Sequence, residues 1–168
     1  MNEDVPRPEY PRPQWRRPDW LNLNGEWEFE EDPGLSGESR GLPSAGSLRG
    51  RILVPFCPES GLSGVGNTDF IPSVWYRRTF RVPDAWERCR VLLHFGAVDY
   101  DAAVWVNGSL VGAHRGGYTP FKFDVTESLR EGENELIVRA ADDTRNPLQP
   151  VGKQSERYQS YGCHYTRT

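Results

Sequence analysis

The chain has 168 residues, a formal net charge of −4, 36% hydrophobic residues and six tryptophans. This length is sufficient for one domain with a sizeable core. The acidic balance argues against non-specific binding to nucleic acid or to an anionic membrane, because both need a basic protein surface.

The sequence gives little sign of export or of disulfide bonding. No apolar run approaches the ~20 residues of a membrane-spanning helix, and the first ten residues, MNEDVPRPEY, lack the apolar core of a secretory signal. Cys57, Cys89 and Cys163 are too few and too scattered for a disulfide scaffold. We therefore expect reduced thiols in a cytoplasmic protein, with a single bridge as the open alternative.

Residues 1–20 predict an extended N-terminal arm. Five prolines between Pro6 and Pro18 exclude a helix and favour a polyproline course. Trp15 and Trp20 interrupt the arm, and we expect them to anchor it by burial, each contributing about 2–3 kcal/mol if fully covered. The main domain is then expected over residues 21–168.

Short alternating segments separated by turn residues predict an all-β domain. The segment 89–95 (CRVLLHF) is an almost continuous apolar run, so we expect a central, well-buried strand there. Residues 32–50 and 56–72 are rich in glycine, serine and proline and are expected to form long loops. The remaining strands are expected at residues 26–31, 52–55, 74–82, 100–106, 121–124 and 135–141. This spacing is typical of a sandwich of antiparallel strands.

The stretch 104–126 (VWVNGSLVGAHRGGYTPFKFDVT) contains the clearest local signal. Asn107-Gly108 between two apolar segments predicts a hairpin, because both residues tolerate positive φ. The glycines that follow indicate bends or close backbone approach, and Pro120 fits only the start or the edge of a strand. A short strand that ends on Asp124 is expected after it.

Several segments, taken in their order and spacing, resemble the N-terminal sugar-binding domain of glycoside hydrolase family 2, the β-galactosidase and β-glucuronidase family. The matching segments are LNGEWEF (23–29), VWYRRTFRVP (74–83), residues 92–126, GENELIVRAAD (132–142), QPVGKQ (149–154) and YGCHYTRT (161–168). The resemblance implies a jelly-roll, galactose-binding-like β-sandwich. It also implies a longer parent chain, in which a TIM barrel carries the two catalytic glutamates that hydrolyse terminal β-glycosidic bonds.

The resemblance further implies an excised domain, because relatives continue from a tail like YGCHYTRT into a tryptophan-containing strand that this sequence lacks. The sheet edge left without that strand would favour self-association. The expected partners are carbohydrate, bound weakly, and the remaining domains of the parent chain. We expect no catalytic residue and no cofactor in this chain, while a metal ion in the parent enzyme is left open.

Asp124 is the best candidate for a sugar contact, because the resemblance places an aspartate at this position in the sugar pocket of glucuronidase-like relatives. An ionised carboxylate can accept two charge-assisted hydrogen bonds from neighbouring sugar hydroxyls. The alternative is that Asp124 caps the turn near Thr126. Tyr118, on the same bend, can either stack on a sugar face or pack against the protein.

A second group of candidates follows the last strand. The resemblance implies that this loop runs toward the barrel, where some relatives use an aspartate for substrate or for a metal ion. The candidate residues are Asp142, Asp143, Gln149 and Lys153. The alternative is a solvated surface loop.

Other catalytic patterns are absent or expected to be structural. Asn134-Glu135 imitates the Asn-Glu pair of the family's catalytic acid, but it lies in a turn that enters a strand, so we expect a structural role. The histidines share no metal-ligand spacing with the cysteines, and no GxSxG elbow is present.

Two functions from different classes fit the sequence. The first is an accessory domain that forms one wall of a glycosidase active site, without activity of its own. The second is a stand-alone carbohydrate-binding module that uses exposed aromatic side chains. Buried tryptophans at positions 15, 20, 75, 86 and 105 would favour the first function, and an exposed planar row would favour the second.

Overall fold

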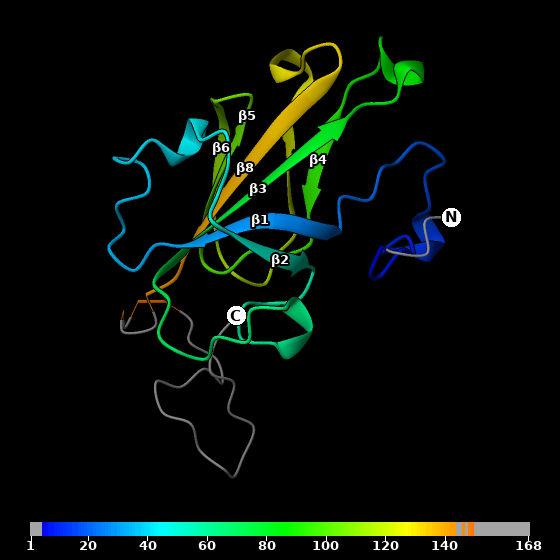
Figure 1. The fold of residues 1–168 in the computed structure, drawn as a ribbon. Coiled ribbons are helices and arrows are strands. Elements are labelled where there is room, and N and C mark those ends of the chain that lie inside the picture. Colours follow the sequence, from blue (N-terminus) through cyan, green and yellow to red (C-terminus); the bar gives the residue numbers. More distant parts are fainter. Residues whose placement is uncertain (1–4, 144–145, 147, 150–168) are drawn as a thin grey trace.

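The computed structural model describes residues 5–143, 146, 148 and 149 (Figure 1). Within these residues the strands form two antiparallel sheets, and the helical segments are single 3₁₀ turns. Six strands form the larger sheet in the order β2-β1-β3-β8-β5-β6, and β4 pairs with β7 in the smaller one. The strands are β1 (Gly25–Glu31), β2 (Gly50–Val54), β3 (Ser73–Arg81), β4 (Leu92–Phe95), β5 (Asp101–Val106), β6 (Ser109–Arg115), β7 (Phe121–Asp124) and β8 (Glu133–Ala141). The predicted all-β architecture is confirmed.

The main core lies between the two sheets. Alternate residues of the larger sheet point into it, among them Trp27 of β1, Val104 of β5 and Leu136 of β8. The smaller sheet covers this inner face with Leu93 and Phe123. Because each fully buried side chain of this size contributes about 1.5–3 kcal/mol, this cluster stabilises the contact between the two layers.

The outer face of the larger sheet carries a second apolar cluster. Trp75 of β3 and Trp105 of β5 stack with their ring centroids 5.4 Å apart, beside Ile137 of β8. Leu42 and Leu48, from the connection between β1 and β2, cover this cluster. The loop predicted at residues 32–50 is therefore packed against the sheet, and the centre of the sheet is buried on both faces.

The predicted hairpin is confirmed between β5 and β6. Asn107 and Gly108 have φ values of 51° and 80°. The Asn107 side chain donates to the Ser128 carbonyl and to Asn134 Oδ1, both at 2.8 Å, and accepts from the Glu135 backbone N–H at 2.9 Å. The turn is thereby bound to the start of β8, where Asn134 is fully buried.

Two expectations are wrong. The segment 89–95 is not a central strand: only Leu92–Phe95 is extended, it belongs to the two-stranded sheet, and His94 faces solvent. Its apolar residues cover one face of the core instead of lying between two layers. In the arm, Trp15 is 75% exposed, while Trp20 is half-buried and packs edge-on against Tyr10. Trp15 therefore does not anchor the arm by burial.

Two further features concern the cysteines and the membrane. Cys57 and Cys89 are unbridged, and Cys163 lies outside the described residues. Among the residues that the structure describes, no helical turn has the length and apolar character needed to cross a membrane.

Candidate functional site

The bend between β6 and β7 presents the first candidate residues. Gly116, with φ of 126°, begins the turn, and Tyr118 follows with 66% of its surface exposed. Tyr118 is therefore not a packing residue of this domain, and its ring is accessible to a ligand. Asp124 is the last residue of β7 and pairs in register with Leu92 of β4.

Asp124 is held by three hydrogen bonds. Its Oδ1 accepts from the Thr126 hydroxyl at 2.6 Å and from the Thr126 backbone N–H at 3.1 Å, and its Oδ2 accepts from Arg90 Nε at 2.5 Å. The Thr126 hydroxyl, followed by Arg90 and the Thr126 N–H, lowers the pKa of Asp124 to about 2. The capping alternative matches these contacts. The side chain is nevertheless 39% exposed, so the sugar contact stays a prediction for an ionised, accessible carboxylate.

The residues after β8 are partly buried. Asp142 and Gln149 are each 7% exposed, and Gln149 Nε2 donates to Asp142 Oδ1. The Asp142 backbone N–H also donates to the Pro72 carbonyl at 3.0 Å. Asp143 is exposed, and Lys153 lies outside the described residues. The structure thus brings Asp142 and Gln149 together but turns them inward, and within this group only Asp143 is seen exposed to solvent.

The Asn134-Glu135 pair has the structural role expected from the sequence. Asn134 bonds to the backbone of Arg130 through both its amide atoms, at 2.9 and 3.1 Å. Glu135 accepts from Arg77 Nε at 2.8 Å on the outer face of the sheet. Both polar side chains are therefore committed to holding the strand in place.

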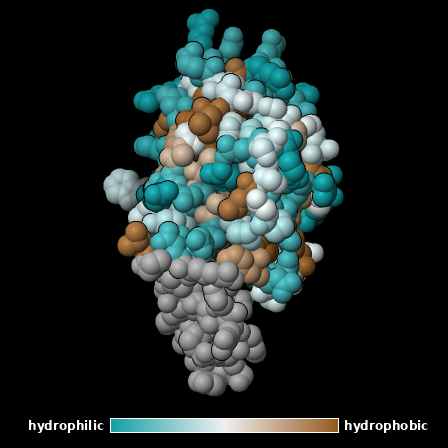
Figure 2. Space-filling model, turned by 90° about the vertical axis from the view of Figure 1, so that its left-hand side faces the viewer, coloured by the Kyte–Doolittle hydropathy of each residue, from teal (hydrophilic) through white to brown (hydrophobic). Residues whose placement is uncertain are grey.

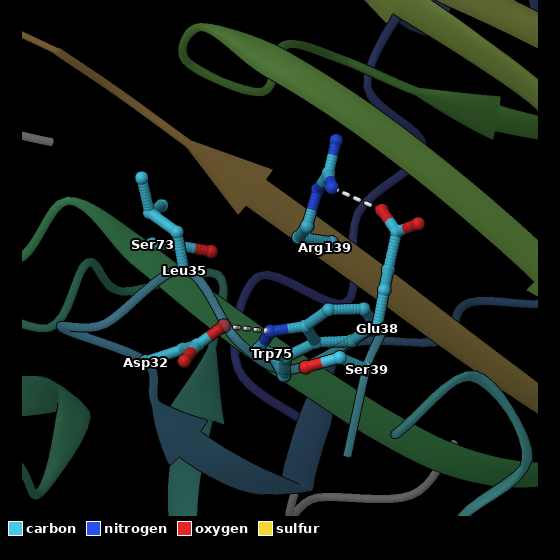
Figure 3. Close-up of a pocket in the computed structure, with 7 residues that line it drawn as sticks. All are labelled: Asp32, Leu35, Glu38, Ser39, Ser73, Trp75 and Arg139. Carbon is cyan, nitrogen blue, oxygen red and sulfur yellow. Dashed lines mark hydrogen bonds and ion pairs between the residues drawn. The ribbon is translucent and has the colours of Figure 1, made fainter. Parts of the chain in front are cut away.

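Sequence reasoning missed a hollow of about 330 Å³ on the outer face of the larger sheet. Figure 3 shows the Trp75 ring between Leu35 and Ser73 on one side and Glu38 on the other. The lining residues come from β3, β8 and the connection after β1: Asp32, Leu35, Glu38, Ser39, Ser73, Trp75 and Arg139. They belong to three segments that are far apart in the sequence and they form no motif, so no local signal could have identified them.

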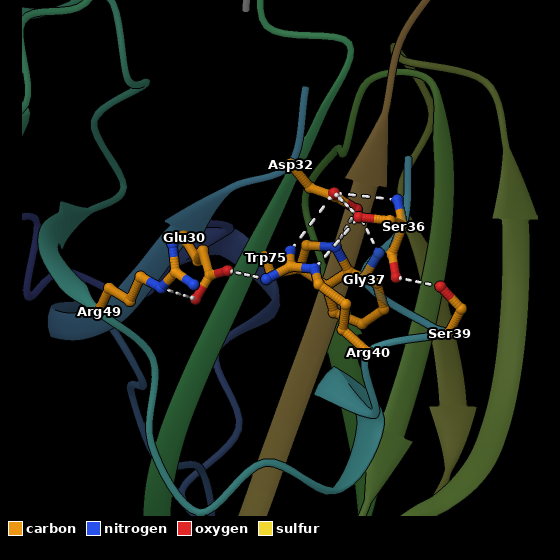
Figure 4. Close-up of polar contacts among 8 residues, drawn as sticks. All are labelled: Glu30, Asp32, Ser36, Gly37, Ser39, Arg40, Arg49 and Trp75. Carbon is orange, nitrogen blue, oxygen red and sulfur yellow. Dashed lines mark hydrogen bonds and ion pairs between the residues drawn. The ribbon is translucent and has the colours of Figure 1, made fainter. Parts of the chain in front are cut away.

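Hydrogen bonds to Asp32 hold one wall of this hollow in place. Its Oδ1 accepts from the Ser36 N–H at 3.0 Å, and its Oδ2 accepts from the Gly37 N–H at 2.7 Å and from Trp75 Nε1 at 3.1 Å (Figure 4). Burial alone raises the pKa of Asp32, but the hydrogen bonds from Trp75, Gly37 and Ser36 outweigh it and hold the pKa below its usual value. An ionised aspartate therefore fixes the loop on the sheet.

Charged side chains surround Asp32 at the rim of the hollow. Arg40 donates from Nη1 to Glu30 Oε1 at 2.5 Å and lies 3.4 Å from Asp32 Oδ1 through Nη2 (Figure 4). Arg139 of β8 donates through Nη1 to Glu38 (Figure 3). The rim therefore consists of paired charges.

The tryptophans do not form an exposed row in the described part of the chain. Trp75 and Trp105 are buried, Trp86 and Trp20 are half-buried, and only Trp15 of these five is exposed. On the face drawn in Figure 2, hydrophobic residues lie in separate patches among hydrophilic ones. Within the described residues, the tryptophan side chains therefore offer no planar platform for a glycan.

Comparison with known proteins identifies the domain. Residues 65–145 match the sequence model described as "Glycosyl hydrolases family 2, sugar binding domain". The chain is 44% identical over 71 residues to a β-galactosidase of Thermoanaerobacter pseudethanolicus, which covers 42% of this chain and 10% of that protein. It is 30% identical over 128 residues to a β-glucuronidase of Paenibacillus borealis, which covers 74% of this chain and 21% of that protein.

Solved structures give the same result. The β-glucuronidase of Lactobacillus rhamnosus superposes with a TM-score of 0.65 and 30% identity, over 73% of this chain and 21% of that protein. A β-glucuronidase of an uncultured Clostridium superposes with a TM-score of 0.60 and 33% identity, over 71% and 21% of the two chains. This chain spans at most about a fifth of the relatives it matches here. The chain therefore carries, at residues 65–145, the sugar-binding domain of glycosyl hydrolase family 2.

Proposed function

We propose that this chain is the N-terminal accessory domain of a family 2 glycoside hydrolase that acts on terminal β-galactosides or β-glucuronides. The observation that carries the proposal is the match of residues 65–145 to the sugar-binding domain. It is supported by relatives named β-galactosidase and β-glucuronidase, of which this chain covers only 10 to 21%. The rest of such a protein would hold the catalytic machinery.

In this proposal the domain supplies one wall of the active site and packs against the barrel. Asp124 is the contact residue, because it is ionised and its side chain is 39% exposed. Each carboxylate oxygen can accept two hydrogen bonds, so Oδ2, which accepts from Arg90, keeps capacity for a sugar hydroxyl. Tyr118 precedes β7 and Asp143 follows β8, so these two exposed side chains extend the wall at the end of the sandwich opposite to Asp124. Asp142 and Gln149 position the loop that carries Asp143.

The cellular setting belongs to the same proposal. We infer that the enzyme works in the cytoplasm, where thiols such as those of the unbridged Cys57 and Cys89 stay reduced. Its partners are the remaining domains of the parent chain and a carbohydrate substrate. A second copy of the chain is a further partner if a sheet edge stays unpaired.

A stand-alone carbohydrate-binding module is the second candidate function. A sandwich fold by itself does not distinguish it from an accessory domain. The burial of Trp75 and Trp105 speaks against a module that binds through a planar aromatic surface. The accessory role is therefore the better supported of the two.

The test is the substitution Asp124→Asn in the intact enzyme, assayed with nitrophenyl β-galactoside and β-glucuronide. We expect KM for the preferred glycoside to rise about tenfold, because one charge-assisted hydrogen bond to the sugar is weakened. Arg90→Gln removes the ion pair but keeps the Asp124 carboxylate. Its KM therefore shows how much of the effect comes from the ion pair alone. Glu127→Gln, an exposed acid on the adjacent turn, is the matched control. An unchanged KM in Asp124→Asn, with an unchanged melting temperature, would refute the wall role.

A further inference from the structure

The outer face of the two-stranded sheet carries cations and lies beside the N-terminal arm. His94 of β4 pairs in register with Lys122 of β7, and both side chains are exposed. Partial burial lowers the pKa of His94, and so do the charges of three neighbouring cations. These are Lys122, Arg17 and Arg12. Because exposed charges are largely screened beyond about 10 Å, both arginines of the arm lie near this strand pair, in agreement with the position of the arm on the β4 side of the molecule (Figure 1).

The course of the arm is fixed at both ends. Asn22 Nδ2 donates to the Arg7 carbonyl at 3.1 Å. Trp20 packs edge-on against Tyr10, with the ring centroids 4.8 Å apart. The prolines at positions 11, 13 and 18 stiffen the segment between these contacts. The arm therefore presents its side chains from a backbone that is already ordered.

The cations beside His94 lack acidic partners. Residues 10–18 (YPRPQWRRP) contain three arginines and no acid, although in the whole chain acids outnumber lysines and arginines by 24 to 20. Four cations of this surface belong to no ion pair in the described part of the chain: Arg12, Arg16, Arg17 and Lys122. Asp124, on the same face of β7, is already paired with Arg90. An anionic ligand would therefore meet positive charges that the protein itself does not neutralise.

Trp15 adds an exposed aromatic ring to these cations. It ends the 3₁₀ turn Pro13–Trp15, and its backbone N–H donates to the Arg12 carbonyl at 2.9 Å. The residue is 75% exposed, so a ligand can cover the ring. An indole offers a large apolar face, and covering it is favourable. We call this region the arm surface; its members are Arg12, Trp15, Arg16, Arg17, His94 and Lys122.

The composition of the arm surface selects the class of ligand. Its members are distributed over the arm and both strands of the smaller sheet, so only an extended ligand reaches all of them. A uronate unit combines the two features that these side chains recognise. Its ring has an apolar face that can stack on an indole, and its carboxylate can accept charge-assisted hydrogen bonds from arginine and lysine. A nucleic acid suits the chain less well, because the chain as a whole is acidic.

We propose that the arm surface binds an acidic glycan, with Trp15 stacked on a sugar ring and the four unpaired cations contacting the carboxylates of uronate units. The choice of a glycan among anionic ligands rests on the proposed function. The location and the charge of the ligand rest on the unpaired cations and on the exposed ring. Lys122 lies two residues before Asp124 on one face of β7, so a glycan whose terminal sugar reaches Asp124 can continue over the arm surface.

An NMR titration of the full 168-residue chain with two matched tetrasaccharides tests this site. One is a tetramer of β-linked glucuronate, and the other is cellotetraose, which has hydroxymethyl groups in place of the carboxylates. We expect saturable shifts of the Trp15 indole N–H and of the backbone at His94 and Lys122. The glucuronate tetramer should bind at least about tenfold tighter than cellotetraose, because only its carboxylates meet the cations. Raising the salt from ~50 to ~200 mM should weaken its binding about fivefold, because the charges are exposed.

The peptide tetraglutamate distinguishes a glycan from an acidic protein. It carries the same number of side-chain carboxylates as the glucuronate tetramer but no sugar ring. We expect it to bind at least about fivefold more weakly, because it leaves the Trp15 ring uncovered.

Trp15→Ala is the decisive variant. Because Trp15 is 75% exposed, its removal should leave the melting temperature unchanged, weaken binding of the glucuronate tetramer about fivefold and leave binding of tetraglutamate unchanged. Lys122→Gln should weaken binding of both anions about threefold. Leu110→Ala, 61% exposed on β6, and Arg49→Gln, 83% exposed before β2, are the matched controls and should bind like the wild type.

Three outcomes would overturn this inference: equal affinities for the glucuronate tetramer and cellotetraose, tetraglutamate bound as tightly as the glucuronate tetramer, or equal affinities of Trp15→Ala and Leu110→Ala. The second outcome would assign the arm surface to an acidic protein partner. The kinetic test at Asp124 is independent of all three. An unchanged KM in Asp124→Asn, with selective binding of the glucuronate tetramer at Trp15, refutes only the wall role. The reverse result refutes only the present inference.

Discussion

The hydrogen bonds around Asp124 keep its carboxylate ionised, and an ionised carboxylate is a strong hydrogen-bond acceptor. Three donors from Thr126 and Arg90 surround its carboxylate, and together they lower its pKa from 3.8 to about 2. A group whose pKa is lower in the folded protein stabilises the fold at pH values above its unfolded pKa, and this contribution is lost as the pH falls through the folded pKa. Asp124 is therefore ionised at every pH at which the protein is expected to act.

A carboxyl-carbon NMR titration measures this directly. The Asp124 resonance should titrate with a midpoint of about 2, and Arg90→Gln should raise the midpoint because one donor to Oδ2 is lost. Glu127→Gln should leave it unchanged. A midpoint near 3.8 in the wild type would contradict the hydrogen bonds described for this carboxylate.

The packed connection between β1 and β2 is the element that shapes the outer face. Its contact with the sheet is close at Gly37, where an added Cβ would lie 2.3 Å from Trp75 Nε1. Gly37→Ala should therefore lower the free energy of unfolding by about 2 kcal/mol, because the loop or the ring must move. Gly34→Ala, whose Cβ would meet only Ser36 Oγ at 3.7 Å, is the control and should stay within about 0.5 kcal/mol. Urea denaturation compares the two variants, and equal values would show that the loop is not docked on Trp75.

The β5-β6 hairpin depends on one side chain. Asn107→Gly keeps a residue that tolerates positive φ but removes the side-chain bonds to Ser128, Asn134 and Glu135. Because Asn134 is buried and loses a partner, the free energy of unfolding should fall by about 2 kcal/mol. Chemical denaturation with Ser109→Ala as the control tests this, and a stability equal to that of the control would assign the turn's stability to its backbone alone.

At the scale of the whole molecule, the chain by itself should hydrolyse neither nitrophenyl β-galactoside nor β-glucuronide. Retaining hydrolysis needs two carboxyls about 5–5.5 Å apart on either side of the scissile bond, and in our proposal both belong to the barrel. An assay of the purified chain beside the intact enzyme measures this. Turnover that scales with the concentration of the chain and persists through a second purification would refute the proposal.

The sequence predicted most of the strands, because periodicity and the Asn107-Gly108 turn are local signals. It was wrong for residues 89–95 and for Trp15, because the burial of an apolar segment depends on the partner that tertiary structure provides. One signal for the packed connection was present: Trp75 and Ile137 lie on the outer face of strands whose inner face is also apolar. Such strands require cover on both sides, and the loop at residues 32–50 supplies it.

The site was only partly predictable, for a different reason. Tyr118 and Asp124 belong to one continuous segment, residues 104–126, so a sequence pattern points to both. Ser73 and Arg139 are diagonal neighbours on one face of the sheet only because β3 and β8 pair in an antiparallel register that sets Ser73 opposite Ala141 and Trp75 opposite Arg139. A register is a property of two strands together, and neither segment contains it alone.

The stacked pair of Trp75 and Trp105 makes the outer face of the sheet optically visible. Two indoles with centroids 5.4 Å apart and an interplanar angle of 26° lie close enough for their electronic transitions to couple, which produces a paired signal of opposite signs in circular dichroism. The signal depends on the relative orientation of the two rings, and Trp75 is also bonded to Asp32 of the loop. Undocking of the loop would therefore change the spectrum before the sheet unfolds, so that the chain carries its own label-free reporter of that movement.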